Sequence, residues 1–124
     1  MKKILIVDDE PYILLAQQFI LEENDFEVIQ ARDAIEAWDK IKQKKPDIAV
    51  IDIYMPPSNK DEGITLLEKI KSDPETNNIP VVMLTARGDQ EDFNKSKKAG
   101  ADEIMLKPFN SKLFMNCINR LLSL

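Results

Sequence analysis

Acidic, hydroxyl and amine side chains directly follow short apolar runs at four places in this chain of 124 residues. These places are Asp8-Asp9-Glu10, Asp52, Thr85-Ala86 and Lys107-Pro108. If the apolar runs are parallel strands, all four places meet at one edge of the sheet, outside the carboxyl ends of the strands. Several carboxylates gathered there would repel one another and raise the pKa of at least one of them unless a cation is present.

A hard divalent cation would relieve this repulsion, and one or two carboxylates with retained water suit Mg²⁺. Lys107 could neutralise part of the acidic cluster when the metal is away. With both charges nearby, an aspartate could attack phosphorus, because phosphoryl transfer needs mainly in-line positioning and neutralisation of charge. The hydroxyl of Thr85 and the backbone N–H of Ala86 could donate to phosphoryl oxygens. The residues therefore predict Mg²⁺-dependent phosphoryl chemistry, although a solvated cluster with a structural ion pair remains an alternative for each residue taken singly.

Hydrophobic patterning predicts the elements that position these residues. Continuous apolar runs are typical of strands covered on both faces, and they lie at residues 4–7, 48–51, 81–84 and 104–106. Residues 26–29 alternate more and indicate an edge-like strand. Helices are predicted between these runs, so the chain is expected to alternate five strands with five helices. Right-handed crossovers then give a doubly wound α/β fold in a single domain over residues 1–124.

Local signals define the expected helices further. Ile13, Ala16 and Ile20 mark one face of the first helix, with Leu14 and Leu21 beside it. Asp33 is an expected N-cap of the second helix, and the third should stop before Asp73-Pro74. The fifth helix should begin after Pro108, capped by Asn110 or Ser111. The fourth, at 89–99, has Phe93 as its single large apolar residue, so we expect it to be the least firmly held.

Composition excludes several classes of function. The chain has no histidine, which removes His-based triads and His-liganded zinc. Its one cysteine, Cys117, excludes an internal disulfide and fits a reducing, cytoplasmic compartment. A net charge of −5 argues against direct binding to nucleic acid or an anionic membrane. Three glycines are too few for a Walker A loop or a dinucleotide-binding fingerprint.

The chain resembles the receiver domain of two-component response regulators over essentially its whole length. The residues that carry the resemblance are those at 4–10, 52–56, 84–86, 100–102 and 107–109, in this order and at suitable spacing. The resemblance implies a flavodoxin-like (βα)₅ fold with a five-stranded parallel sheet of order 2-1-3-4-5. It also implies a phosphorylation-dependent signalling switch, without an enzymatic activity beyond its own phosphorylation and slow dephosphorylation.

The resemblance implies roles residue by residue. Asp52 matches the aspartate that accepts a phosphoryl group from the phosphohistidine of a sensor histidine kinase or a phosphotransferase domain. Asp9 and Asp52 match direct Mg²⁺ ligands, Asp8 matches a ligand acting through a water, and Tyr54 should offer its backbone carbonyl to the metal. Thr85 matches the hydroxyl that turns toward the acyl phosphate, and Lys107 matches the lysine that pairs with it. The Lys107–Pro108 bond is expected to be cis, and an unknown output partner is expected on the face of the fourth helix, fifth strand and fifth helix.

Three positions depart from the family pattern. Gly63 follows Asp52 by eleven residues where eight are usual, so a loop at 57–62 is predicted to be longer by about three. Ile104 occupies the place of the usual switch aromatic, which changes the expected conformational readout but not phosphorylation. Arg87 and Tyr54 stand where the family tunes the access of water to the phosphoryl group.

The main alternative is a Mg²⁺-dependent aspartyl-phosphate phosphohydrolase of the haloacid-dehalogenase kind. Such enzymes carry a second aspartate two residues after the nucleophile, whereas Asp8 and Asp9 are adjacent, and the sequence offers no segment for a substrate cap. A flavodoxin-like binding module is a further alternative, but a Ser/Thr/Gly-rich loop after the first strand is absent. A receiver that binds partners without phosphorylation is a third, which the complete set of acidic residues disfavours.

Overall fold

The computed structural model describes residues 1–56, 61–86 and 88–123, in which five strands and five helices alternate. In chain order they are β1 (Lys3–Val7), α1 (Pro11–Glu23), β2 (Glu27–Ala31), α2 (Ala34–Lys44), β3 (Ile48–Asp52), α3 (Glu62–Ser72), β4 (Val81–Thr85), α4 (Gln90–Lys98), β5 (Glu103–Leu106) and α5 (Ser111–Leu121). The predicted alternation of strands and helices is confirmed.

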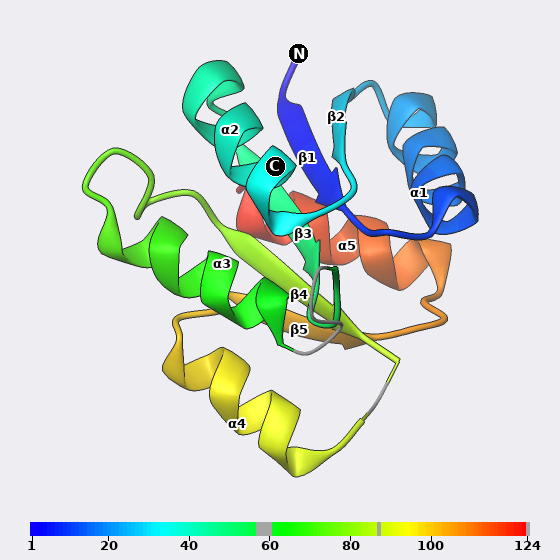
Figure 1. Cartoon of the computed structure of the whole chain (residues 1–124). Coiled ribbons are helices and arrows are strands. Elements are labelled where there is room, and N and C mark those ends of the chain that lie inside the picture. The colour runs from blue at the N-terminus through cyan, green and yellow to red at the C-terminus, as the bar shows by residue number, and fades with distance from the viewer. Residues whose placement is uncertain (57–60, 87, 124) are drawn as a thin grey trace.

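The five strands form one parallel sheet of order β2-β1-β3-β4-β5, as expected. Figure 1 shows α1 and α5 on one face of this sheet and α2, α3 and α4 on the other. The fold is therefore the doubly wound, flavodoxin-like α/β arrangement, with the carboxyl ends of all strands at a single edge.

Successive residues of the central strands belong alternately to two separate hydrophobic cores, one on each face of the sheet. Leu5 and Val7 pack with residues of α2 and α3 on one face of the sheet. Ile4 and Ile6 point the other way and pack with Leu14 of α1 and residues of α5. Both faces of β1 are buried, which explains why its apolar run is continuous rather than alternating.

The predicted ends of several helices are confirmed. The side chain of Asp33 accepts from the backbone N–H of Glu36, and that of Asn110 accepts from the N–H groups of Lys112 and Leu113. Helix α3 ends at Ser72, directly before the Asp73-Pro74 pair. These caps satisfy backbone donors that the first turn of a helix leaves without partners.

The face that Ile13, Ala16 and Ile20 mark on α1 is not the buried one, although Leu14 and Leu21 beside it are buried. The buried residues of this helix are Leu14, Gln17 and Leu21, whereas Ala16 is exposed and Ile13 and Ile20 are half-buried. The helix is apolar around much of its circumference, so its hydrophobic pattern does not single out one face. The structure places Leu14 and Leu21 on the sheet and leaves a polar residue, Gln17, between them.

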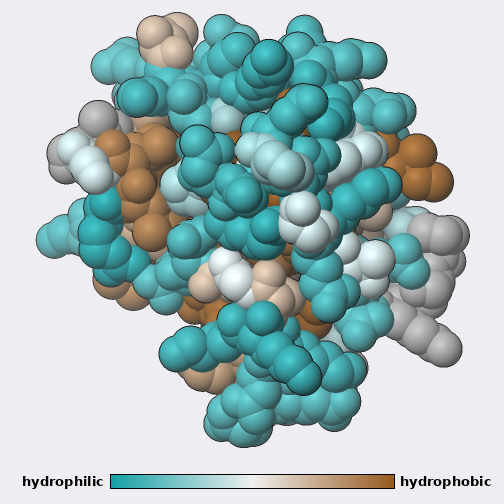
Figure 2. All heavy atoms as spheres, turned by 90° about the vertical axis from the view of Figure 1, so that its left-hand side faces the viewer, coloured by the Kyte–Doolittle hydropathy of each residue, from teal (hydrophilic) through white to brown (hydrophobic). Residues whose placement is uncertain are grey.

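The surface is mostly polar on the side drawn in Figure 2, where hydrophobic residues form small separate groups among hydrophilic ones. Among the described residues, no helix is both long and apolar enough to cross a membrane.

Candidate functional site

The carboxyl edge of the sheet brings the predicted residues together through strand register. Asp52, the last residue of β3, pairs in register with Leu84 of β4, and Thr85 pairs with Leu106 of β5. Asp8 follows β1, whose last residue Val7 pairs with Ile51. Because the strands are parallel and in step, Asp8, Asp52, Thr85 and Lys107 all emerge at neighbouring strand ends.

Lys107 connects two of the acidic residues directly. Its Nζ lies 2.7 Å from Oδ2 of Asp8 and 3.3 Å from Oδ2 of Asp52. Asp8 is fully buried and Asp52 is 6 % exposed. The backbone N–H of Lys107 donates to the carbonyl of Thr85 at 2.8 Å, which fixes the lysine at the end of β4, and the Lys107–Pro108 bond is cis as expected. The ammonium of Lys107 therefore forms ion pairs with two buried carboxylates.

The electrostatics of this group make Asp52 unusual among the acidic residues. Burial raises the pKa of its carboxyl from an ordinary 3.8 to about 6, against the opposing charge of Lys107 and with the charges of Asp8 and Asp9 adding to the rise. Burial alone would lower the pKa of Lys107, but the hydrogen bond to Asp8 and the charge of Asp52 outweigh it and raise that pKa. The cluster carries more negative than positive charge in a poorly solvated place.

Asp8, Asp9 and Glu10 form a compact group of possible metal ligands, because one carboxylate oxygen from each lies within 4.8 Å of the others. The backbone N–H of Glu10 donates to Oδ1 of Asp8 at 3.0 Å and holds this turn together. The donors are all oxygens, which suits Mg²⁺ and other hard cations. Asp52 faces the same edge, and its pKa responds to the charges of both Asp8 and Asp9. The ligand set predicted from the resemblance (Asp9, Asp52, the Tyr54 carbonyl, and Asp8 through water) stays a prediction.

Gly63, near the start of α3, lies against the backbone of the segment that carries Asp52. Its backbone N–H donates to the carbonyl of Ile53 at 2.9 Å. A Cβ at this position would lie 2.0 Å from the carbonyl oxygen of Asp52, far closer than any real contact. Glycine is therefore required here by the close approach of two backbones. The predicted lengthening of the loop at 57–62 falls mainly on residues 57–60, which lie outside the described part of the chain.

Asp92 of α4 is a residue that the sequence analysis missed. Its carboxylate accepts from the hydroxyl of Tyr54 at 2.5 Å and from the hydroxyl of Thr85 at 3.5 Å, and it is only 4 % exposed. Tyr54 stands two residues after Asp52, and Thr85 ends the neighbouring strand. Nothing in the sequence marks Asp92, because it is one charge among many in a helix with little apolar character.

The remaining predicted positions are placed as follows. Ala86 follows Thr85 directly and is exposed, and a donor role for its backbone N–H stays a prediction. Ile104 is half-buried on β5, where it packs against the core on the α2–α3 face. Together with Thr85 and Phe93 it lines a cavity of about 230 Å³ between α4 and β5. Arg87 lies outside the described residues.

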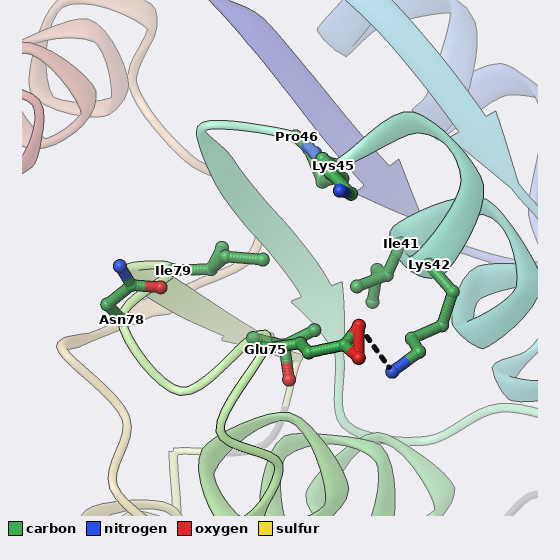
Figure 3. A pocket seen from close by; sticks show the side chains of 8 residues that line it. Ile41, Lys42, Lys45, Pro46, Glu75, Asn78 and Ile79 are labelled. Carbon is green, nitrogen blue, oxygen red and sulfur yellow. Dashed lines mark hydrogen bonds and ion pairs between the residues drawn. The ribbon is translucent and has the colours of Figure 1, made fainter.

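A second cavity, of about 160 Å³, lies at the opposite edge of the sheet. Figure 3 shows its lining, in which residues at the end of α2 and in the connection to β3 face residues between α3 and β4. Lys42 and Glu75 form an ion pair at 3.3 Å across it. None of the predicted site residues lines this cavity, so it plays no part in the arrangement around Asp52.

Comparison with known proteins gives the same picture as the geometry. Residues 4–119 match the family described as the response regulator receiver domain. The chain is 37 % identical over 111 residues to the phosphate regulon transcriptional regulatory protein PhoB of Escherichia coli, covering 90 % of this chain and 47 % of that protein. It is also 37 % identical to the alkaline phosphatase synthesis transcriptional regulatory protein PhoP of Bacillus subtilis, covering 90 % of this chain and 44 % of the relative. The chain thus spans less than half the length of these relatives.

Solved structures agree closely in fold. A CheY-like response regulator receiver domain protein from Methanospirillum hungatei superposes with a TM-score of 0.91 at 34 % identity, over 99 % of this chain and 94 % of that one. The chemotaxis response regulator CheY4 of Vibrio cholerae superposes with a TM-score of 0.88 at 27 % identity, over 98 % of each chain. The chain therefore belongs to the response regulator receiver domain family of two-component signalling.

Proposed function

We propose that this domain is a phosphorylation-dependent switch that accepts a phosphoryl group on Asp52. The observation that carries the proposal is the position of Lys107, whose ammonium lies within 3.3 Å of both Asp8 and Asp52. Two nearly buried carboxylates with one cation between them are costly to stability. This arrangement is favourable for a reaction in which Asp52 gains phosphoryl oxygens that need positive charge nearby.

The reaction would transfer the phosphoryl group of a phosphohistidine to Asp52. A carboxylate oxygen of Asp52 forms the new bond to phosphorus, the phosphorus–nitrogen bond breaks, and the imidazole leaves and takes up a proton. These 124 residues contain no histidine, so the donor imidazole lies outside them, and we propose that a sensor histidine kinase or a phosphotransferase domain supplies it. The domain would catalyse only its own phosphorylation and slow dephosphorylation.

Some residues around Asp52 would bind the metal, and others would contact the phosphoryl group. Asp9, Asp52 and the carbonyl of Tyr54 would hold Mg²⁺, with Asp8 acting through a water. Bound Mg²⁺ would supply positive charge for the phosphoryl oxygens. Lys107 would exchange its contact with Asp52 for a contact with the phosphoryl group, while Thr85 and the N–H of Ala86 would donate to the other oxygens.

The partner that reads the switch is proposed to bind the face formed by α4, β5 and α5. Three large apolar side chains are exposed there, one on each element: Phe93, Leu106 and Leu113. Exposed apolar side chains that gather on one face are typical of a binding surface. This face also includes the helix whose first turn carries Asp92, the residue in contact with Tyr54 and Thr85.

Phosphorylation can be tested with a small-molecule donor. The protein is incubated with acetyl phosphate and MgCl₂, and intact-mass spectrometry is used to look for one labile phosphoryl adduct. We expect an adduct in the unaltered protein, none in Asp52→Asn, and a strong reduction when EDTA replaces MgCl₂. The absence of an adduct, or one that persists in Asp52→Asn, would overturn the proposal. Rapid release of phosphate from many phosphomonoesters would instead favour a phosphohydrolase.

A further inference from the structure

We propose that Asp92 is a positioning residue that holds the hydroxyl of Thr85 away from Asp52 and releases it when Asp52 is phosphorylated. The inference rests on the proposed function, because it makes α4 the element that responds to the phosphoryl group on Asp52. Asp92 does not touch the reacting atoms itself. It acts through Thr85 and Tyr54, the two residues that it binds.

Helix α4 is attached to the domain by polar rather than apolar contacts. Its buried residues are Asp92 and Ser96, and its one large apolar residue, Phe93, is 43 % exposed. A helix with so little apolar burial depends on its few specific hydrogen bonds. The carboxylate of Asp92 supplies two of them, one from each of its oxygens.

These two hydrogen bonds reach residues that are close to Asp52 in the chain and in the sheet. Tyr54 continues the chain beyond β3, two residues after Asp52, and Thr85 ends β4, the strand paired with β3. The contact with Tyr54 is short, at 2.5 Å, whereas that with Thr85 is long, at 3.5 Å. A hydrogen bond weakens as its length grows, so the Thr85 contact is the one that is readily exchanged.

The hydroxyl of Thr85 has a single hydrogen and donates to one acceptor at a time. While it donates to Asp92, it cannot donate to an oxygen on phosphorus. A phosphoryl group on Asp52 would therefore compete with Asp92 for this hydrogen. When the phosphoryl group wins, Asp92 keeps only its contact with Tyr54, and α4 loses one of its attachments.

The space around α4 allows such a change. The cavity of about 230 Å³ between α4 and β5 is lined by Thr85, by Asp89, which caps α4, and by Phe93 and Ile104. Ile104 has no polar side-chain atom and cannot take part in the exchange of hydrogen bonds. Asp92 competes for the hydroxyl of Thr85 from α4, and the cavity leaves room for α4 to shift.

A double-mutant cycle tests the competition. The rate of adduct formation on Asp52 is measured with acetyl phosphate and MgCl₂ in the unaltered protein, Asp92→Asn, Thr85→Val and the double variant. Because a neutral amide holds the hydroxyl less strongly, we expect Asp92→Asn to raise the rate about three- to tenfold. In the Thr85→Val background, which has no hydroxyl to release, Asp92→Asn should leave the rate unchanged.

The matched control is Glu91→Gln, which removes the same charge from the same turn of α4 but at an exposed side chain paired with Lys95. We expect it to behave like the unaltered protein. A second measurement is hydrogen exchange of residues 90–98, which should become several-fold faster on phosphorylation and be equally fast in Asp92→Asn without the adduct.

The outcomes separate this inference from the proposed function. If the unaltered protein forms no adduct, the proposed function fails and this inference fails with it. The adduct could instead form, with Asp92→Asn changing its rate by the same factor in the unaltered and the Thr85→Val backgrounds. Asp92 would then only stabilise α4, and this inference alone would be overturned. No rate change in Asp92→Asn would overturn it equally.

Discussion

The ammonium of Lys107 lies 2.7 Å from the carboxylate of Asp8, although these residues follow strands at different parts of the sheet. Asp8 follows β1 and Lys107 follows β5, and the sheet order places β3 and β4 between them. The lysine side chain therefore extends across the ends of two strands. Asp52 ends β3, one of these two strands, and its Oδ2 lies 3.3 Å from the same nitrogen.

The raised pKa of Asp52 predicts that stability falls as the pH rises. Between about pH 4, the ordinary pKa of an aspartate, and the folded value of about 6, the folded protein binds more protons than the unfolded chain. The free energy of unfolding should therefore decrease across this window, by at most about 3 kcal/mol, with the loss complete above pH 6. Urea unfolding in EDTA, from pH 4 to 8, measures it.

Asp52→Asn supplies the comparison for this pH dependence, because it removes the titrating group and keeps its shape. The difference between the two unfolding curves isolates Asp52 from the other carboxylates. We expect Asp52→Asn to be more stable than the unaltered protein at pH 7.5 and to lose this advantage at pH 4. A difference that does not vary with pH would contradict the assignment of the raised pKa to Asp52.

Addition of Mg²⁺ should stabilise the folded protein, since the carboxylates at the edge of the sheet repel one another without it. At a concentration ten times its dissociation constant, the gain is about 1.4 kcal/mol. Thermal unfolding with MgCl₂ and with EDTA measures this gain. Asp9→Asn should abolish it, whereas Asp39→Asn, on the exposed part of α2, should retain it. Equal stabilisation of both variants would place the binding of Mg²⁺ elsewhere.

Lys107→Met should destabilise the protein because it leaves Asp8 and Asp52 without their shared cation. Breaking a buried ion pair on one side typically costs about 3 kcal/mol or more. The loss should be smaller at pH 5 than at pH 7.5, since a proton can then neutralise Asp52. Urea unfolding at both pH values, with Lys112→Met at the start of α5 as control, gives the comparison. The same loss at both pH values would show that the carboxylates are not its source.

Gly63→Ala should cost at least about 2 kcal/mol of stability, because the added methyl meets the carbonyl oxygen of Asp52 and one of the two backbones must move. Gly88→Ala is a suitable control, since a Cβ there meets only the side chain of Leu106, at 3.2 Å. Chemical denaturation of both variants tests the difference. If Gly63→Ala is as mild as Gly88→Ala, the contact between the backbones is looser than the structure indicates.

Much of the fold could be predicted because its signals are local. A continuous apolar run such as 48–51 reports that both faces of β3 are buried, and Asp33 and Asn110 cap helices through their own side chains. Since parallel strands share one functional edge, the convergence of Asp8, Asp52 and Lys107 also followed from strand ends. The structure bears this convergence out through two short contacts.

What could not be predicted depends on tertiary packing. Leu15 and Phe19 of α1 are apolar yet exposed, so the pattern of this helix does not tell which side faces the sheet. Asp92 looks like any charge on a polar helix until Tyr54 and Thr85 are placed beside it. Asp92 is 38 positions from Tyr54 and 7 positions from Thr85 in the sequence, and no spacing rule predicts contacts at these separations.

The bridge from Lys107 to Asp8 also has a consequence for how the domain is synthesised and folds. These residues are separated by 99 positions in the sequence, so the bridge cannot form before nearly the whole domain has emerged and the sheet is complete. Before that moment Asp52 lacks its cation and its buried surroundings, and its carboxyl behaves as an ordinary one. Reactivity toward a phosphoryl donor would therefore require a chain that has folded through β5, and chains that have not yet placed Lys107 would not be phosphorylated efficiently.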